Sequence, residues 1–210
     1  MARLSDDKRE IVRRGYDRAG ARYHATRPVD GRDMGLLPEL DHRIRPGARI
    51  LDVGCGTGVP VARELADLGH EVVGVDLSMV QLGLANSHVP RLRGVAAEMT
   101  ALPIGTSVFD ALVSYYAVIH VPRDDHGAVF REFRRVLRPE GNALLCIGTD
   151  DNPEDHDTDS WLGTPMYWSH FDAETTIAII TGAGWRVDAS WQVPDPMGHG
   201  THRFVLARAT

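Results

Sequence analysis

Hydrophobic and polar residues follow two alternating patterns along most of the chain. Five short apolar runs have the length of buried strands, and they occupy residues 48–53, 71–75, 92–96, 108–115 and 143–147. Between them, apolar residues recur every three or four positions, which predicts amphipathic helices at 59–68, 78–89 and 124–137. Because parallel strands need long crossover connections, this alternation predicts an α/β fold with a largely parallel sheet and helices on both of its faces.

The N-terminal region and a later polar region interrupt this alternation. Residues 1–45 predict two helices, at 5–24 and 33–44, and we expect this region to pack over the domain as a helical lid. Residues 148–171 begin with a polar, acidic stretch that lacks a helical pattern, and an aromatic patch follows. We expect this second region to form a loop or lid on the substrate side.

The chain closes with a further helix and two strands, and its length fits one domain. A helical pattern covers 172–183, and strands are expected at 185–191 and 203–208 on either side of a turn rich in proline and glycine. With 210 residues, of which 43% are hydrophobic, the chain can bury one substantial core. We therefore predict a single domain over residues 1–210.

The charge balance argues against nucleic acid as a partner. The formal net charge is −6, whereas phosphate neutralisation needs clustered lysine and arginine. The basic clusters are short, at Arg13-Arg14 and within 131–138, and they fall on helices where a solvated charged face explains them. A small neutral or cationic substrate therefore fits better than a polyanion.

Cysteine usage and hydropathy point to a cytoplasmic protein. Cys55 and Cys146 lie in apolar or glycine-rich runs and do not suggest a disulfide framework. No run approaches the roughly 18 apolar residues of a membrane span, and no apolar stretch follows the charged N-terminus. We therefore expect neither a membrane partner nor export.

A glycine-rich turn after the first strand is the strongest chemical signal. The sequence ILDVGCGTGVP contains Asp52 and then Gly54, Gly56 and Gly58. Glycine lets the backbone turn sharply and lets a flat ligand lie against it. The dinucleotide fingerprint would need glycine where Val59 stands, and no Lys-Ser or Lys-Thr pair follows to make a phosphate-binding loop. The turn therefore disfavours both NAD and nucleotide phosphates.

Acidic residues follow the next two strands. Asp76 closes the second strand in GVDLS, where a carboxylate can accept hydrogen bonds from both ribose hydroxyls of a nucleoside. Glu98 lies in the loop after the third strand and could accept the exocyclic amine of adenine, with Met99 supplying a backbone contact. A solvated loop acid is the alternative interpretation of Glu98.

Together these motifs resemble the class I S-adenosylmethionine (SAM)-dependent methyltransferases that modify small molecules. The glycine turn, the two acidic residues, the strand FDALVSYYAVIHV and the helix ending in VLRPEG occur in the family's order over nearly the whole chain. The resemblance implies a Rossmann-like seven-stranded sheet, mostly parallel with its last strand antiparallel, and SAM as the cofactor. It implies cofactor contacts from Tyr16, Tyr23, Arg27, Asp52, Gly54, Cys55, Gly56, Gly58, Asp76, Leu77, Glu98, Met99 and Tyr115.

Two histidines are candidates for catalysis at the methyl acceptor. His120 follows the fourth strand, at the edge of the sheet where ligands bind in open α/β folds, although a structural histidine is an equal alternative there. His170 lies in LGTPMYWSHFD, which also resembles small methyltransferases and contributes aromatic rings suited to a flat or amine acceptor. His199 and His202 could face the same opening. A hydroxyl acceptor benefits from such a base, whereas a neutral amine does not need one.

The acidic stretch does not predict a metal site. An EF-hand loop starting at Asp155 would need glycine and glutamate where Ser160 and Met166 stand. We therefore expect metal-free transfer of a methyl group from SAM to an oxygen or nitrogen atom of a small molecule. The alternative is a SAM-binding protein of the same fold with a pericyclic, decarboxylating or regulatory role.

Overall fold

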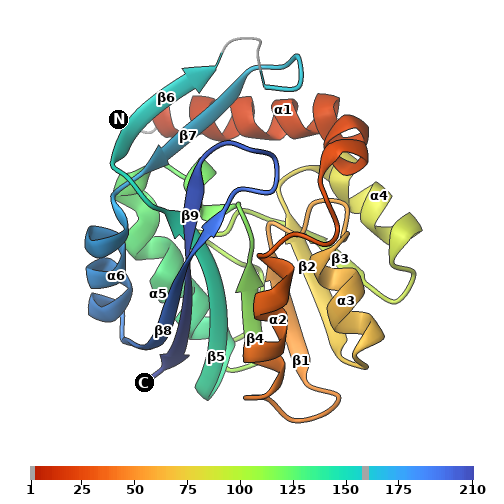
Figure 1. Cartoon of the computed structure of the whole chain (residues 1–210), viewed down its shortest axis with the longest axis vertical. Coiled ribbons are helices and arrows are strands. Elements are labelled where there is room, and N and C mark those ends of the chain that lie inside the picture. The colour runs from red at the N-terminus through yellow and green to blue at the C-terminus, as the bar shows by residue number, and fades with distance from the viewer. Residues whose placement is uncertain (1–2, 158–160) are drawn as a thin grey trace.

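A seven-stranded sheet forms the centre of the computed structural model, which describes residues 3–157 and 161–210 (Figure 1). The strand order is β3-β2-β1-β4-β5-β9-β8. The bounds are β1 Arg49–Val53, β2 Glu71–Asp76, β3 Arg93–Ala96, β4 Phe109–Ser114, β5 Leu137–Gly148, β8 Trp185–Pro194 and β9 Thr201–Ala209. The pairs among β1 to β5 are parallel, and β9 runs antiparallel to both β5 and β8. The predicted fold class, including the antiparallel last strand, is confirmed.

Helices cover both faces of this sheet (Figure 1). One face carries η1 Met34–Leu36, α2 Leu37–Asp41, α3 Val61–Asp67 and α4 Met79–His88. The other face carries α5 His126–Val136 and α6 Ala173–Gly182, and the short helices η2 Val118–His120 and η3 Arg123–Asp125 lie between β4 and α5. Within the described residues, no helix combines the length and apolar character that would let it cross a membrane.

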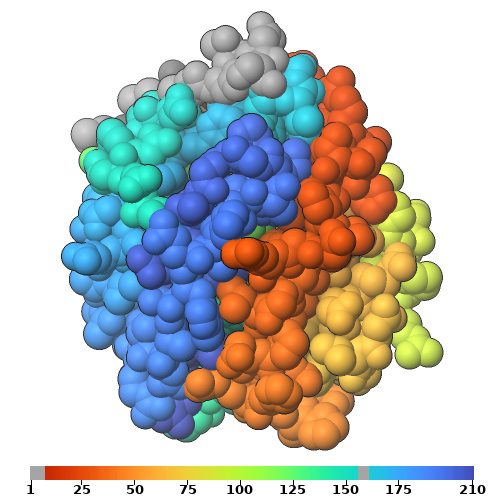
Figure 2. Space-filling model, viewed as in Figure 1, coloured from red at the N-terminus to blue at the C-terminus, as the bar shows by residue number. Residues whose placement is uncertain are grey.

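The first helix, α1, lies across the top of the sheet in Figure 1, where the parallel strands end. It covers Arg3–Thr26 and packs against α4 and against β7 (Met166–His170). The second N-terminal helix was predicted at 33–44 but ends at Asp41, and it begins as a 3-10 turn because Pro38 lacks the N–H that would continue a helix from upstream. In space-filling view the orange N-terminal segment packs against the blue C-terminal one (Figure 2), and Arg43 Nη1 lies 2.7 Å from Asp188 Oδ2.

Two strands lie within 148–171, where a loop or lid on the substrate side was expected. Strands β6 (Asn152–Asp157) and β7 (Met166–His170) pair as an antiparallel two-stranded sheet, while 158–160 lie outside the described residues. The aromatic β7 favours an extended conformation, and its backbone groups can pair with β6 even though the β6 side chains are polar. The acidic stretch is thereby held beside α1, where Lys8 Nζ lies 2.7 Å from Glu154 Oε2.

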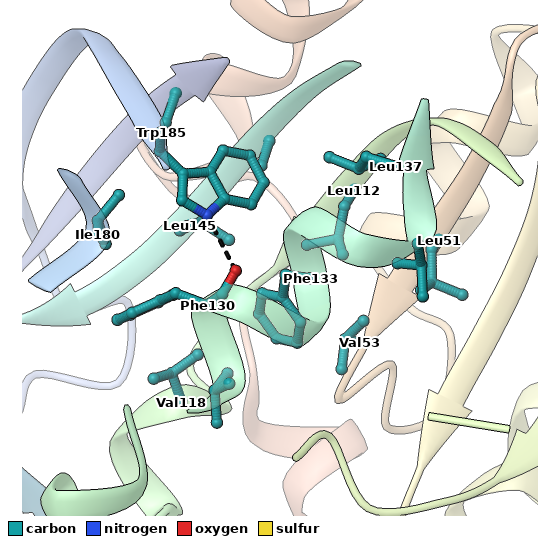
Figure 3. Close-up of a cluster of buried hydrophobic side chains, with 14 of the residues drawn as sticks. Leu51, Val53, Leu112, Val118, Phe130, Phe133, Leu137, Leu145, Ile180 and Trp185 are labelled. Atoms are coloured by element: carbon teal, nitrogen blue, oxygen red, sulfur yellow. Dashed lines mark hydrogen bonds between the residues drawn. The ribbon is translucent and has the colours of Figure 1, made fainter. Parts of the chain in front are cut away.

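The core beneath the sheet anchors the segment that carries the site. Figure 3 shows side chains of β1, β4, β5, α5 and α6 converging, with Phe130 and Phe133 of α5 among them. The indole N–H of Trp185 donates to the carbonyl oxygen of Phe130 over 2.9 Å, which fixes α5 against β8. Val118 of η2 belongs to this core and Ile119 belongs to the core on the other face, so η2 is held from both sides.

Candidate functional site

The glycine-rich turn places backbone close to the ends of β1, β2 and β4. Gly54 and Gly56 have φ values of +76° and +53°, in the left-handed region that favours glycine. A Cβ at Gly54 would collide with the side chain of Ala117, in the segment after β4. Glycine is therefore required at this position because a third strand end packs directly on the turn.

Asp76 ties this turn to the start of α4. Its Oδ2 accepts the backbone N–H of Gly56 and its Oδ1 accepts that of Ser78, each over 2.9 Å. Burial raises the pKa of Asp76 to about 6, although these backbone hydrogen bonds oppose the shift. Each carboxylate oxygen can accept two hydrogen bonds, so each keeps one lone pair for a ligand hydroxyl.

Three other residues of the turn that were predicted to contact the cofactor line neither of the two cavities described below. Asp52 is 2% exposed, and burial together with the charge of Asp76 raises its pKa to about 7. Its Oδ2 has no hydrogen-bond partner among the described residues. Cys55 is a buried free cysteine near the backbone of Gly74, and Gly58 packs against α4.

The turn, Asp76 and α1 enclose a first cavity of about 110 Å³. Nine of the residues predicted to contact the cofactor line it: Tyr16, Tyr23, Gly54, Gly56, Asp76, Leu77, Glu98, Met99 and Tyr115. Arg9, Val12 and Arg13 also line it and were not predicted from the sequence. These positions share one helical face with the tyrosines of α1, so their spacing was the signal that could have identified them.

Arg9 of α1, which lines the first cavity, forms ion pairs with carboxylates of two other segments. Its Nε lies 2.7 Å from Glu98 Oε1 and its Nη2 lies 3.1 Å from Asp125 Oδ2. The hydroxyl of Thr100 also donates to Glu98 Oε1. The Glu98 carboxylate therefore keeps Oε2 as the oxygen that can reach a ligand.

Arg27 lies outside the cavity wall, unlike the other lid residues predicted to contact the cofactor. Its Nη2 lies 2.9 Å from Oδ2 of the fully buried Asp33. Its guanidinium carbon lies 5.1 Å from the ring centre of Tyr116, a residue with a left-handed φ of +55°. Arg27 therefore supports Tyr116, whose ring does line the cavity.

A second, larger cavity of about 820 Å³ adjoins the first. Four residues line both cavities and so mark their junction: Tyr16, Tyr23, Tyr116 and His120. The second cavity alone is lined by Trp161, Trp168, His170, His199 and His202. The structure thus brings together residues from α1, the end of β4, β7 and the β8–β9 turn.

His120 is held at the junction through both ring nitrogens. Its Nδ1 lies 2.7 Å from the carbonyl oxygen of Tyr167, which can only accept, so Nδ1 carries the proton. Its Nε2 lies 3.0 Å from Tyr16 Oη and therefore accepts the tyrosine hydroxyl. Burial lowers the pKa of His120 to about 4, so the ring is neutral at pH 7. This arrangement orients Tyr16 and leaves His120 no free lone pair for a substrate proton.

His170 lines the second cavity but not the junction. Its Nδ1 donates to the carbonyl oxygen of Asp150 over 2.9 Å, and burial lowers its pKa. The two histidines predicted to be catalytic therefore lie in different places, with His120 at the junction and His170 in the wall of the second cavity. Only His120 reaches the boundary between the cavities.

Comparisons with known proteins give a consistent family. Residues 50–141 match the family described as methyltransferase domain. The chain is 34% identical over 181 residues to malonyl-(acyl-carrier protein) O-methyltransferase of Pseudescherichia vulneris, which covers 85% of this chain and 69% of that protein. It is 35% identical over 144 residues to 24-methylenesterol C-methyltransferase 2 of Oryza sativa subsp. japonica, covering 62% of this chain but only 37% of that one.

Solved structures share the fold over nearly the whole chain. The 1,6-didemethyltoxoflavin-N1-methyltransferase of Burkholderia thailandensis, with 1,6-didemethyltoxoflavin and S-adenosylhomocysteine bound, has a TM-score of 0.75 at 23% identity and covers 100% of this chain and 92% of its own. The (4+2)-cyclase SpnF has a TM-score of 0.73 at 18% identity, with 94% of each chain covered. At these identities the likeness concerns the fold.

Proposed function

This chain belongs to the class I SAM-dependent methyltransferases, and we propose that it transfers the methyl group of SAM to an oxygen or nitrogen atom of a small molecule held in the second cavity. The observation that carries the proposal is the shared boundary of the two cavities at Tyr16, Tyr23, Tyr116 and His120. A cofactor in one cavity and an acceptor in the other would meet there.

The residues of the first cavity fit SAM. The free lone pairs of Asp76 suit two ribose hydroxyls, and Leu77 and Met99 supply apolar surface for adenine. The Oε2 atom of Glu98 suits an exocyclic amine. When bound, SAM supplies an electrophilic methyl group on a sulfonium.

The chain's own contribution at the junction is orientation. Tyr16 and Tyr23 of α1 stand edge to face with ring centres 5.8 Å apart, and the hydroxyl of Tyr16 is fixed by His120. Methyl transfer is an in-line displacement, and correct positioning can contribute about 7–11 kcal/mol to lowering its barrier. We propose that α1 acts as the lid that excludes water from this boundary.

The net charge and the free cysteines support a proposal for the class of acceptor and for the cellular compartment. The net charge of −6 supports an acceptor other than nucleic acid. Cys55 and Cys146 are both free and buried, which supports a reducing compartment such as the cytoplasm. We propose that the acceptor is a free small molecule.

The test measures S-adenosylhomocysteine released by the protein with SAM and a panel of amines, phenols, alcohols and carboxylates. We expect release that depends on the acceptor and a product whose mass rises by one methyl group. Calorimetric binding of S-adenosylhomocysteine without acceptor-dependent release over the panel would favour the non-methylating alternative. The fold that this chain shares with a (4+2)-cyclase makes this control necessary.

A further inference from the structure

Resting on the methyl transfer proposed above, we propose that the acceptor atom is a nitrogen that arrives unprotonated, on a molecule that carries no carboxylate or phosphate. Three features of the junction and of the second cavity lead to this inference. They are the absence of a free base at the junction, the charge of the cavity wall and its aromatic surface.

The junction residues offer no base to an acceptor hydroxyl. Both ring nitrogens of His120 are engaged, by Tyr16 and by a backbone carbonyl. Burial raises the pKa of Tyr16, Tyr23 and Tyr116 above that of a free phenol, so these hydroxyls keep their protons at neutral pH. An alcohol or phenol acceptor would have to lose its proton at this point, whereas a neutral nitrogen already presents its lone pair.

The wall of the second cavity is acidic. Its lining includes Asp155 and Asp195, and among the described residues it contains no lysine or arginine. His202 Nε2 lies 3.0 Å from Asp195 Oδ2 and offsets at most that one charge, while His199 is exposed to solvent. Three cations in the surrounding segments are paired with carboxylates of their own: Lys8 with Glu154, Arg123 with Asp151 and Arg27 with Asp33. An acceptor carboxylate or phosphate would therefore meet repulsion without a cationic partner.

Aromatic rings complete the wall beside the junction. The ring centre of Trp161 lies 5.1 Å from that of Tyr16 and 6.3 Å from that of Trp168, both in edge-to-face arrangement. Tyr23 lies 5.9 Å from Trp161. Ring faces attract cations, and the attraction is strongest where water is excluded. The wall thus suits an acceptor that becomes positive when it is methylated.

The reaction balances without a base in the transfer step. The nitrogen lone pair forms the new N–CH₃ bond as the S–CH₃ bond breaks, and the sulfur keeps the bonding pair. The positive charge passes from sulfur to nitrogen, where the π faces and the carboxylates stabilise it as it develops. If the methylated nitrogen carries a proton, that proton leaves afterwards to water.

The first experiment measures binding to the complex with S-adenosylhomocysteine and does not depend on turnover. Its probes are choline, the isosteric alcohol 3,3-dimethylbutan-1-ol and 3,3-dimethylbutanoate, titrated while the indole N–H signals are followed by NMR. We expect choline to bind roughly tenfold more tightly than the alcohol, and the carboxylate more weakly than either. Equal affinity for choline and the alcohol, tighter binding of the carboxylate, or no measurable binding of choline would overturn the inference.

Variants identify the groups responsible for this preference. Asp195→Asn keeps the Oδ1 atom that accepts from Met197 N, and it should reduce the preference for choline over the alcohol to about threefold or less. Trp161→Leu should reduce the preference while retaining apolar surface. Glu174→Gln, an exposed charge change on α6, should leave it unchanged. A preference that survives both cavity variants contradicts the assignment to these groups.

The second experiment follows turnover with two amine acceptors of different pKa. The acid limb of the rate profile should move with the pKa of the acceptor, because the unprotonated nitrogen is the reacting form. A limb that stays in place would assign the deprotonation to the protein and contradict the inference. Release of S-adenosylhomocysteine with phenols or carboxylates but not amines would leave methyl transfer intact and remove nitrogen as the acceptor. A preference for choline without any turnover would retain the charge argument and remove the methyl transfer.

Discussion

Replacing Asp76 with asparagine tests how the first cavity holds a nucleoside. The native carboxylate accepts two backbone N–H groups and keeps one lone pair on each oxygen. Asparagine keeps one accepting oxygen, so the ligand loses one hydrogen bond from a ribose hydroxyl to a charged acceptor, which costs about 1.5–3 kcal/mol, and the backbone N–H of Gly56 or Ser78 also loses its acceptor. We therefore expect the dissociation constant for S-adenosylhomocysteine to rise by roughly 10- to 150-fold at pH 7.5, measured by calorimetry.

The pH dependence of S-adenosylhomocysteine affinity in the same variant distinguishes the loss of the Asp76 charge from a change in the shape of the site. Because the pKa of Asp76 is about 6 and ribose hydroxyls hydrogen-bond best to the ionised form, native affinity should weaken as the pH falls through 6. The part of this dependence due to Asp76 should vanish in Asp76→Asn. Asp52, whose pKa of about 7 is raised in part by the charge of Asp76, titrates in both proteins but at a lower pH in the variant.

The thermal midpoint is measured beside the affinity, because Asp76→Asn leaves the backbone N–H of Gly56 or Ser78 without its acceptor. A carboxyl whose folded-state pKa is raised destabilises the folded protein when ionised, so removing its charge at pH 7.5 should not lower the thermal midpoint through the charge. Asp67→Asn, an exposed change on α3, serves as the control with native affinity and a native midpoint. An unchanged dissociation constant in Asp76→Asn, or two superimposable pH profiles, would refute the assignment of the ribose hydroxyls to this residue.

Three further perturbations test the supports of the site. Arg27→Met leaves the buried carboxylate of Asp33 unpaired and should lower the unfolding free energy by about 3–5 kcal/mol in urea denaturation, and a double variant that adds Asp33→Asn should recover most of this loss. Trp185→Phe keeps an aromatic ring but removes the indole N–H that donates to the Phe130 carbonyl, so calorimetric melting should show a loss of about 0.5–1.5 kcal/mol. Tyr16→Phe frees the Nε2 lone pair of His120 and should lower kcat with little change in S-adenosylhomocysteine affinity; a proportional change in both would point to a general loss of structure.

The strands and the cofactor loop could be predicted because their signals are local. Buried parallel strands read as continuous apolar runs, and left-handed backbone at Gly54 and Gly56 demands glycine, so both features are visible in the sequence. The same applies to Ser78, which caps α4 through the N–H of Gln81 as the start of a predicted helix would require. The strand β6 was missed because its pairing comes from its partner strand and not from its own polar side chains.

The roles of the side chains depend on contacts between distant segments. His120 and Tyr16 are 104 positions apart, and His120 and Tyr167 are 47 apart, so no spacing in the sequence indicates that both nitrogens of His120 are occupied. Arg27 was predicted to contact the cofactor, yet its side chain does not line the first cavity because it pairs with Asp33. Such pairings form only when the chain has folded, because burial makes an unpaired charge costly.

The sequence by itself determined the order of the elements, the glycine turn and Asp76, since each follows from periodicity or backbone conformation within a few residues. Only the tertiary structure decided that α1 faces the first cavity and that Tyr16, Tyr23, Tyr116 and His120 stand where the two cavities meet. It also decided that Asp155 and Asp195 line the second cavity, while Lys8, Arg27 and Arg123 are paired with carboxylates of their own. Charge and hydrogen bonding at the site depend on residues that are distant in sequence and adjacent in the fold. Their order along the chain does not show which of them lie close together.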